Sequence, residues 1–435
     1  MIYQVFTTLL KWKPTRRLLQ IAKHVKLFQI WVPMLREWAE KDNISQYPEI
    51  SLLGMDGINN FKIIANNFKF NSPLLVTDPV LIKTGVVQAV IKQLDYLKIK
   101  YTIFDGVQPN PSIQVVQKII DMYQTSKSDA LISIGGGSAH DAIKGASLVL
   151  SNKGRELKKF QGLNVTPNVS IAPIIAINTT AGTGSDVTNA AVITDEVKHF
   201  KMTLVDKNIQ PHAIVDDSNL MLGLPAKQSA WVGIDALVHG IEAELSIFSN
   251  LTSRTYARQT MRIVYQHLPL VYEKTDNKFA REKMAYAEFL GGLAFNSASL
   301  GFIHSMSHAM SGVFNTPHGL ANAVLLPYVL DYELKSKKIV PKIANLSRFM
   351  QMNNASEDVF GKAQETIRNL IAFTKALGVP SNLSEVQPKI SKKDIRQMAK
   401  KAMKDFCGIS NPIQFSRREV IRIYHNAISG KFDNI

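Results

Sequence analysis

One Asp and four His in the second half of the chain have the types and spacing of a metal site. Asp235 and His239 stand four residues apart in GIDALVHGIEAE, and His304 and His308 repeat that spacing in GFIHSMSHAM. Residues four apart on a helix share one face. His318 follows in NTPHG, where Thr and Pro predict a helix start that places this imidazole in the first turn. A helix N-terminus disfavours imidazolium, which keeps an imidazole neutral for metal binding.

The residues around these polar groups are apolar, and this favours a metal. Burying a carboxylate and several imidazoles among Leu, Ile, Val and Met is costly unless they are paired, and one divalent cation would pair them all. A single His in such a sequence is more often an ordinary core residue. Imidazole and carboxylate ligands suit iron(II) or zinc and exclude a soft thiolate site. A metal here could polarise an alcohol or carbonyl oxygen, while hydride passes between the substrate carbon and a nicotinamide.

A glycine-rich segment in the first half has the character of a phosphate site. In GGGSAHDAIKG (135–145), an apolar run ends in three glycines and a helix is expected to begin at Ser138. Glycines let the backbone approach an anion closely, and a helix N-terminus offers unpaired N–H groups. His140 occupies the third position of the GxGxxG fingerprint, so the match to that motif is incomplete. A tight turn without a ligand is the alternative.

Two further features of the first half favour a nicotinamide dinucleotide. The segment NTTAGTGSDVT (178–188) is dense in hydroxyl groups and glycine, which suits a pyrophosphate or a nicotinamide amide, although an ordinary polar loop has the same composition. Asp78 ends an apolar run, where a carboxylate can bind a ribose diol and would repel a 2′-phosphate. That predicts NAD rather than NADP. The alternative is a solvated turn Asp before Pro79.

The elements that position these residues change in character near residue 222. Before it, apolar runs alternate with helical patterns, which indicates a mainly parallel sheet covered on both faces. Strands are expected over 72–78, 100–107, 129–137 and 169–180, and helices over 83–98, over 112–123 and from Ser138. After residue 222, helical periodicity dominates through residue 430. The sequence therefore predicts an α/β nucleotide-binding domain (46–222), an all-α metal-binding and catalytic domain (223–435), and a site in the cleft between them.

The composition indicates a folded protein with a sizeable buried core. The chain has 435 residues, is 46% hydrophobic and 20% charged, and has no uninterrupted apolar run long enough for a spanning helix. Cys407 is its one cysteine, which fits a reducing compartment and a cytoplasmic location. The net charge is +16, but no nucleic-acid-binding motif accompanies it, so a solvated basic surface is the favoured interpretation.

The first 45 residues form a separate basic extension rich in tryptophan. Residues 1–36 hold seven Lys or Arg and no acid, which leaves +9 for the rest, and the extension contains Trp12, Trp31 and Trp38. Basic residues interleaved with aromatic ones suit a peripheral membrane contact. An acid-free start also suits an organelle-targeting segment, although Ser is missing from it. An extra helix packed on the body, or on a second subunit, is the third possibility.

From about residue 46 to about residue 430 the sequence resembles the iron-containing (group III) alcohol dehydrogenases, which include lactaldehyde, 1,3-propanediol and butanol dehydrogenases. The matching stretches are GGGSAHDAIKG, INTTAGTGSDVT, GIDALVHGIEAELS, FNSASLGFIHSMSHAMSG and NTPHGLANAVLLPYVLDY. In this order and spacing they are far more specific than a lone glycine loop. The resemblance implies an enzyme that interconverts small primary alcohols or diols with aldehydes, using NAD and Fe²⁺, with Zn²⁺ as the other candidate.

The resemblance also assigns roles to individual residues. Its metal ligands fall on Asp235, His239, His304 and His318, and its proton-handling or substrate-orienting residue falls on His308, which is then no ligand. Its cofactor-binding positions are Asp78, Asn110, Gly137, Ser138, Asp141, Thr179, Thr180, Thr183 and Lys201. Its substrate-pocket positions are Phe295, Leu300 and Cys407. Cys407 taken alone would more often be a small buried filler.

Some features depart from the family or lie outside it. Asp186 stands where the family usually has Glu, which leaves a slightly larger gap, and Ala190 stands where some relatives carry an Asn near the substrate. Members are commonly dimers or larger, so a homo-oligomer is expected. The alternatives to a dehydrogenase are an NAD-recycling lyase of the dehydroquinate synthase type, and a membrane-associated protein that uses residues 1–45.

Overall fold

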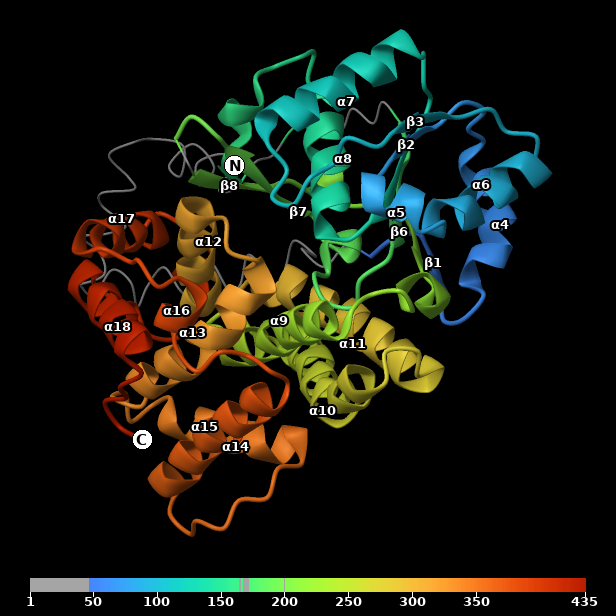
Figure 1. Cartoon of the computed structure of the whole chain (residues 1–435). Helices are drawn as coiled ribbons and strands as arrows, with labels where there is room; N and C mark the ends of the chain where they lie inside the picture. The colour runs from blue at the N-terminus through green and yellow to red at the C-terminus, as the bar shows by residue number, and fades with distance from the viewer. Residues whose placement is uncertain (1–46, 164–165, 167–171, 199) are drawn as a thin grey trace.

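The computed structural model describes residues 47–163, 166, 172–198 and 200–435. The sheets lie in the first part of this chain and a large group of helices follows, as Figure 1 shows. The α/β fold followed by a helical region is therefore confirmed. The basic extension, with the predictions of membrane contact and targeting, lies outside the described residues. Among the helices that are described, none is both long and apolar enough to cross a membrane.

A six-stranded sheet organises the first part, and all its pairings are parallel. The strand order is β1-β9-β6-β4-β2-β3. The strands are β1 (Ile50–Leu53), β2 (Leu74–Val76), β3 (Thr102–Phe104), β4 (Leu131–Gly135), β6 (Ile174–Asn178) and β9 (Ala213–Asp216). The predicted strands over 72–78, 100–107 and 129–137 are confirmed with shorter bounds, and so is the described part of 169–180. Strands β1 and β9 were not predicted.

Alternate residues of the sheet enter two separate cores. Leu74 and Val76 pack with α7 and α8, whereas Leu75 between them packs with α4 and α6. Burial on both faces explains why the central strands are continuously apolar. The helices of this part are α4 (Phe61–Phe68), α5 (Pro79–Lys83), α6 (Val86–Tyr96), α7 (Ile113–Thr125) and α8 (Gly137–Ser151). The helix expected from Ser138 thus begins one residue earlier, and the one expected over 83–98 begins at Val86.

A small second sheet, not predicted from the sequence, lies beside the large one. Its order is β5-β8-β7, with β5 (Gly162–Leu163), β7 (Ala190–Asp195) and β8 (Phe200–Val205). Strands β7 and β8 form an antiparallel pair in which Ala190 lies opposite Val205 and Asp195 opposite Phe200. Helix α12 of the helical region packs against β8. The second sheet therefore places Lys201, on β8, next to a helix that carries candidate site residues.

Ten helices make up the described chain after the sheets, around a single large apolar core. They are α9 (Ala226–Leu245), α10 (Leu251–Glu273), α11 (Lys278–Ala298), α12 (Phe302–Phe314), α13 (His318–Glu333), α14 (Val340–Met350), α15 (Val359–Ala376), α16 (Leu383–Val386), α17 (Lys392–Ala402) and α18 (Arg417–Ser429). Short 3-10 turns are η1 (Gly57–Asn60), η2 (Leu157–Phe160), η3 (Ser185–Val187), η4 (Lys207–Ile209), η5 (Ser218–Met221) and η6 (Cys407–Ser410). Helix α9 crosses the middle of the molecule in Figure 1, while α12 and α11 pack against strands β8 and β9.

One close backbone contact joins the polar segment 178–188 to the helices. A Cβ added at Gly184 would lie 2.6 Å from the Cα of Gly292 on α11, and Gly184 has φ +60°. Only glycine combines that conformation with so close an approach at little cost. The segment that the sequence assigned to cofactor binding is therefore held against the helical region.

Candidate active site

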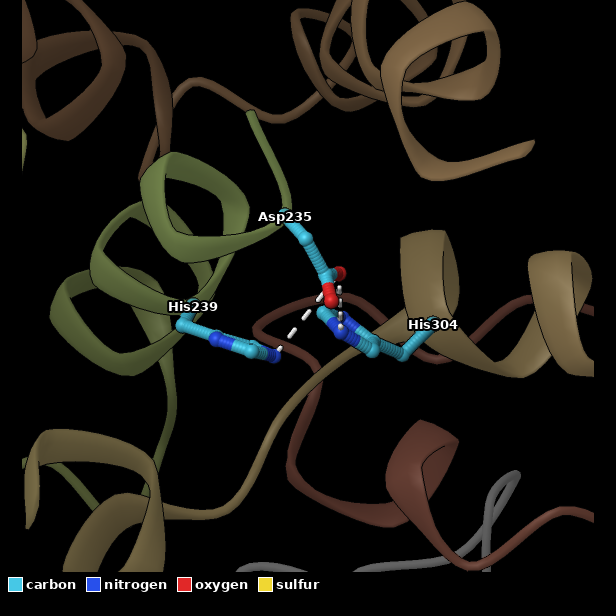
Figure 2. Close-up of side chains that lie close together, drawn as sticks. All are labelled: Asp235, His239 and His304. Atoms are coloured by element: carbon cyan, nitrogen blue, oxygen red, sulfur yellow. Dashed lines mark ion pairs between the residues drawn. The ribbon is translucent and has the colours of Figure 1, made fainter. Parts of the chain in front are cut away.

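Asp235 is the centre of the polar cluster in the helical region. It lies on α9 with His239, while His304 lies on α12 and His318 is the first residue of α13. The Nε2 atoms of His239, His304 and His318 lie 3.8, 3.5 and 3.7 Å from the same Asp235 Oδ1. Figure 2 shows the side chains of Asp235, His239 and His304 pointing toward one another from two helices. The predicted sharing of one helix face is confirmed, and so is the helix start at His318, although Pro317 caps it without a side-chain hydrogen bond.

The pKa shifts in this cluster favour neutral imidazoles around one ionised carboxylate. Burial lowers the pKa of His239 to about 3 and holds the pKa of His318 well below its usual value. Burial also opposes protonation of His304, but Glu242 and Asp235 outweigh it and raise the pKa of His304 to about 9. Burial opposes ionisation of Asp235, yet the surrounding histidines outweigh this and lower its pKa. The carboxylate is therefore ionised, and it faces at least two neutral imidazoles.

The distances from Asp235 Oδ1 to the three imidazole nitrogens fit a divalent metal, and the ligand atoms of Asp235, His239 and His304 all lie within 4.8 Å of one another. Metal to nitrogen or oxygen bonds of about 2.1 Å in a tetrahedral site place the donor atoms about 3.4 Å apart. The separations of 3.5 to 3.8 Å around Asp235 Oδ1 are close to that value. Three imidazoles and one carboxylate are also ligands that suit iron(II) or zinc. The residues present thus fit the metal that the sequence predicted, in chemistry and in spacing.

Three residues outside the predicted set orient the cluster. Glu242 Oε2 accepts a hydrogen bond of 2.6 Å from Nδ1 of His304, and its Oε1 accepts one of 2.7 Å from the Ile303 N–H. Ser307 Oγ lies 3.3 Å from Nδ1 of His318. Partners of this kind direct Nε2 toward a metal and raise the basicity of the ligand. A sequence signal existed for Glu242, because it lies three residues after His239 on the same helix face.

Asn322 is the third of these residues and touches most of the cluster. Its Nδ2 donates to Asp235 Oδ1 at 2.6 Å and lies 3.1 and 3.2 Å from Nε2 of His304 and His318. Its Oδ1 is buried and has no hydrogen-bond partner in the described chain. Asn322 follows His318 by four residues on α13, so the helix spacing used for the histidines would also have found it.

His308 has a different partner from the other histidines. Its Nδ1 lies 2.9 Å from Asp405 Oδ2, and its ring stacks on that of His318 at a centroid separation of 4.9 Å. Burial disfavours ionised Asp405, but the hydrogen bonds and charge of its neighbours, His308 first among them, lower its pKa. Cys407 lies beside this pair, and its backbone N–H donates to Asp405 Oδ1 at 2.9 Å. Sequence reasoning missed Asp405, which stands 97 positions from His308.

The two predicted nucleotide segments meet in space. A Cβ added at Gly136 would lie 2.8 Å from Thr180 Oγ1, and one at Gly137 would lie 3.1 Å from the Thr183 side chain. The backbone N–H of Thr179 also donates to the Gly135 carbonyl at 3.0 Å. Ser138 lies in the first turn of α8, beside these contacts. The glycine-rich turn and the threonine-rich segment thus form one continuous backbone surface at the N-terminus of α8, with glycines where the two pack most tightly.

Asp141, a predicted cofactor residue, is engaged within the protein. Its Oδ1 accepts from Ser185 Oγ at 2.6 Å and its Oδ2 from the Val192 N–H at 2.9 Å. Lys144, one turn further along α8, donates to Ser185, Thr188 and the Ala190 carbonyl. Burial lowers the pKa of Lys144 to about 8. These bonds tie α8 to the segment 178–188 and to β7.

The remaining predicted cofactor residues occupy three other places. Asp78 is the N-cap of α5, where its Oδ1 accepts from the backbone N–H groups of residues 80 and 81. Asn110 has φ +59° and donates to Asn315 Oδ1 of the helical region at 2.6 Å. Burial lowers the pKa of Lys201 to about 8, and its charge interacts with Asp141, Asp235 and Asp405. The charge of Lys201 thus interacts both with Asp141 of α8 and with Asp235 of the metal cluster.

The position where the family usually has Glu is fully buried. Asp186 faces Glu288 of α11, and burial raises the pKa of both carboxyl groups. Glu288 Oε1 accepts from the Gly184 N–H at 2.5 Å. The shorter acid at 186 is thus accompanied by a second carboxyl group that holds the segment 178–188 on α11. Nothing local in the sequence points to Glu288.

The predicted substrate-pocket residues lie on different sides of the metal cluster. Phe295 of α11 lies against His239, with ring centroids 4.5 Å apart. Cys407 is buried on the side of His308, and burial raises its pKa well above the usual value, so its thiol is neutral. Leu300, between α11 and α12, is buried, and its carbonyl accepts from Ser410 Oγ. Phe295 and Cys407 thus adjoin the candidate metal residue His239 and the proton-handling candidate His308, respectively.

Comparison with known proteins shows the family to which the chain is similar. Residues 48–218 match the family model described as iron-containing alcohol dehydrogenase, and residues 229–428 match the C-terminal model of the same family. Alcohol dehydrogenase 4 of Saccharomyces cerevisiae is 35% identical over 380 residues, which cover 87% of this chain and 97% of that protein. The NAD-dependent methanol dehydrogenase of Bacillus methanolicus is 34% identical over 381 residues, covering 88% and 98%.

Solved structures give the same result. A crystal structure of 1,3-propanediol oxidoreductase superimposes with a TM-score of 0.83 at 33% identity and covers 88% of this chain and 98% of that one. The alcohol dehydrogenase from Oenococcus oeni also gives a TM-score of 0.83, at 32% identity with the same coverage. The two family models together span most of the chain after the basic extension.

Proposed function

Because the chain belongs to the iron-containing alcohol dehydrogenase family, we propose that it interconverts small primary alcohols or diols with aldehydes, using NAD and a divalent metal. Iron(II) is the metal we propose, with zinc as the second candidate. The family and its relatives are alcohol and aldehyde oxidoreductases, and they do not favour an NAD-recycling lyase.

A single observation carries the proposed metal chemistry. Three imidazole Nε2 atoms approach one carboxylate oxygen, Asp235 Oδ1, within 3.8 Å, in a site where Asp235, His239 and His304 are buried and His318 is partly exposed. Without a cation, the Asn322 amide group is shared between this carboxylate and two of the imidazoles, and a neutral donor offsets little of the cost of burying an ionised carboxylate. We therefore assign Asp235, His239, His304 and His318 as the residues that hold the metal. His308 is excluded from this set because, within the described chain, its Nε2 makes no recorded contact with Asp235, whereas Nε2 of each of the other three histidines does.

The proposed roles of the other residues follow from their places. When bound, the metal supplies Lewis-acid polarisation of the substrate oxygen, and NAD accepts hydride from the substrate carbon. Backbone N–H groups at the N-terminus of α8 receive the dinucleotide phosphates, and Thr180 and Thr183 line the same surface. Lys201 interacts electrostatically with Asp141 and Asp235, and its proposed role is to orient the nicotinamide end. His308 takes up the proton of the substrate hydroxyl.

The cofactor preference and the substrate pocket involve residues outside the metal cluster. Asp78 Oδ1 is occupied as a helix cap, which leaves Oδ2 to bind a ribose diol and to repel a 2′-phosphate. We also propose that Asn110 and Asp141 support the dinucleotide and that Phe295, Leu300 and Cys407 line the substrate pocket. We also propose a homo-oligomer, a cytoplasmic location, and a domain division between residues 222 and 223.

The proposed function is tested with protein purified without oxygen and loaded with iron(II) or zinc. A chain-length series of alcohols and aldehydes is offered with NAD or NADP while NADH or NADPH absorbance is followed. We expect turnover with short primary alcohols or diols and a preference for NAD. A metal-loaded protein that turns over no member of the series would refute the dehydrogenase function.

The metal assignment has its own test. His304→Ala and His318→Ala each remove one imidazole from the cluster, and we expect both variants to lose bound metal and activity. His425, an exposed residue of α18, provides the control, because His425→Ala removes an imidazole far from the cluster in sequence and should change neither. Metal analysis by mass spectrometry gives the readout besides activity. Full metal content in both cluster variants would overturn the assignment.

A further inference from the structure

His308 and Asp405 form a buried pair whose second member has no role so far. His308 lies on α12, and Asp405 lies in the loop between α17 and η6. Nδ1 and Oδ2 are 2.9 Å apart. The other carboxylate oxygen, Oδ1, accepts from the Cys407 N–H at 2.9 Å and from Ser305 Oγ at 3.4 Å. Three donors therefore hold the carboxylate in place, and one of them is the imidazole.

The pair fixes which nitrogen of His308 carries hydrogen. An ionised carboxylate can only accept hydrogen bonds, so Nδ1 must be the protonated nitrogen of the neutral imidazole. Its Nε2 then carries a lone pair. No hydrogen bond from the part of the chain that the structure describes is recorded at Nε2, and the ring stacks on His318. The lone pair is thus carried by a ring that lies directly against the candidate metal residues.

We propose that Asp405 is a positioning residue that keeps His308 in the Nδ1–H tautomer, so that Nε2 accepts the proton of the substrate hydroxyl. The inference rests on the proposed function. In alcohol oxidation the substrate carbon loses hydride to NAD and its oxygen loses a proton. The O–H bond breaks as an N–H bond forms at Nε2, and the imidazolium then releases that proton to water. Aldehyde reduction uses the same steps in reverse.

A second metal on His308, Asp405 and Cys407 is the competing interpretation, because their donor atoms lie within 4.8 Å of one another. Two observations favour the hydrogen-bonded pair instead. Burial raises the pKa of the Cys407 thiol, which keeps the sulfur protonated and a poor metal ligand. Both oxygens of Asp405 already accept from donors of the protein. The contacts are explained without a bound ion.

Asp405→Asn tests the tautomer directly. The Cys407 N–H and the Ser305 hydroxyl both need an acceptor, so the amide oxygen stays with them and the NH₂ group faces Nδ1 of His308. The imidazole must then accept at Nδ1 and carry its hydrogen on Nε2. In protein labelled with ¹⁵N at histidine, we expect Nδ1 of His308 to take the chemical shift of a nitrogen with a lone pair and Nε2 that of a nitrogen that carries hydrogen. The His308 signals are assigned by their loss in His308→Ala.

The same variant should lose turnover with little change in alcohol binding. A proton acceptor contributes about 10²- to 10⁴-fold to a rate, so kcat should fall by about that factor while KM changes little. If Asp405 acts only through His308, Asp405→Asn in the His308→Ala background should cause no further loss. The matched control is Asp331→Asn, because Asp331 is also buried and accepts two backbone N–H groups, at residues 433 and 434. It should keep kcat and the His308 shifts of the wild type.

The outcomes separate this inference from the proposed function. An unchanged tautomer in Asp405→Asn, or an equal loss of kcat with and without His308, would overturn the positioning role. Bound zinc on Asp405 and Cys407, detected as a second metal in the wild type that is lost in Cys407→Ser, would also overturn it. If the wild type oxidises no alcohol while the tautomer changes as expected, the proposed function fails and the tautomer assignment stands.

Discussion

Glu242 is the residue whose replacement best tests how the metal cluster is held. In Glu242→Gln one of the two side-chain oxygens becomes an NH₂ group. Oε1 now accepts from the Ile303 N–H at 2.7 Å and Oε2 from Nδ1 of His304 at 2.6 Å. The amide oxygen can accept from only one of these two donors, and the other N–H would then face the NH₂ group, which is also a donor. The variant therefore leaves a buried donor unpaired, or turns the His304 ring away from Asp235.

The size of the effect follows from this loss. Removing such a partner of a metal-binding histidine typically weakens metal affinity about 10- to 100-fold, which corresponds to about 1.4 to 2.8 kcal/mol. We expect the upper part of that range, because Glu242 is buried and makes both of its hydrogen bonds within the cluster. The four donor atoms themselves remain, so metal binding should be weakened and not abolished. That separates the variant from His304→Ala.

The assay is competition for iron(II) or zinc between the protein and a chromogenic chelator. Glu244→Gln is a close control, because Glu244 lies on the same helix and makes two charge-assisted hydrogen bonds, to Arg258 instead of a histidine. It should keep the metal affinity of the wild type. Equal affinity in Glu242→Gln and the wild type, with both folded by circular dichroism, would refute the orienting role of Glu242.

Two further predictions concern stability. Gly184→Ala forces a side chain into a left-handed backbone conformation and toward the Cα of Gly292, and the conformation alone costs about 1 to 2 kcal/mol. Thermal unfolding should therefore occur at a lower temperature, and KM for NAD should rise. The control Gly223→Ala should be nearly neutral, because an added Cβ there meets nothing within 4 Å. Burial raises the pKa of Glu333 to about 8 from an ordinary 4.5. The folded protein then binds a proton that the unfolded chain releases, so this group's contribution to stability falls as pH rises between these two values. Glu333→Gln should remove this pH-dependent loss of stability, so the urea midpoint of the variant relative to the wild type should rise with pH. A difference in urea midpoint that does not depend on pH would contradict this.

The sequence predicted the parts of the fold that have a strong local pattern. The central strands and the helix with Asp235 and His239 combine long apolar runs or clear periodicity with the expected ends. Strands β1 and β9 were missed because each has only four residues, and their assignment depends on pairing with distant strands. The β7 and β8 pair was missed although it is antiparallel and local. The division of domains at residue 222 stays a prediction.

The site was predictable where chemistry and helix spacing coincide. Asp235 and His239 share a helix face, and Glu242 and Asn322 lie three and four residues after His239 and His318 on α9 and α13, so helix spacing could have identified both. Asp405 was not, because its contact with the histidine joins residues far apart in sequence. A sequence of this kind indicates which residue types meet on one helix, whereas contacts between helices depend on tertiary packing.

His304 and His308 show why sequence alone could not separate a metal ligand from a proton-handling residue. They lie on one helix, four residues apart, and each has its Nδ1 bonded to a carboxylate, Glu242 in one case and Asp405 in the other. Both therefore direct Nε2 away from that carboxylate. The difference lies in what the second nitrogen meets, because Nε2 of His304 is 3.5 Å from Asp235 Oδ1 and no such contact is recorded for His308 among the described residues. An imidazole whose lone pair converges on other donors is suited to a cation, and one whose lone pair stands apart is suited to a proton. If both carboxylates act in this way, Glu242→Gln should change metal affinity more than kcat at saturating metal, and Asp405→Asn should change kcat more than metal affinity.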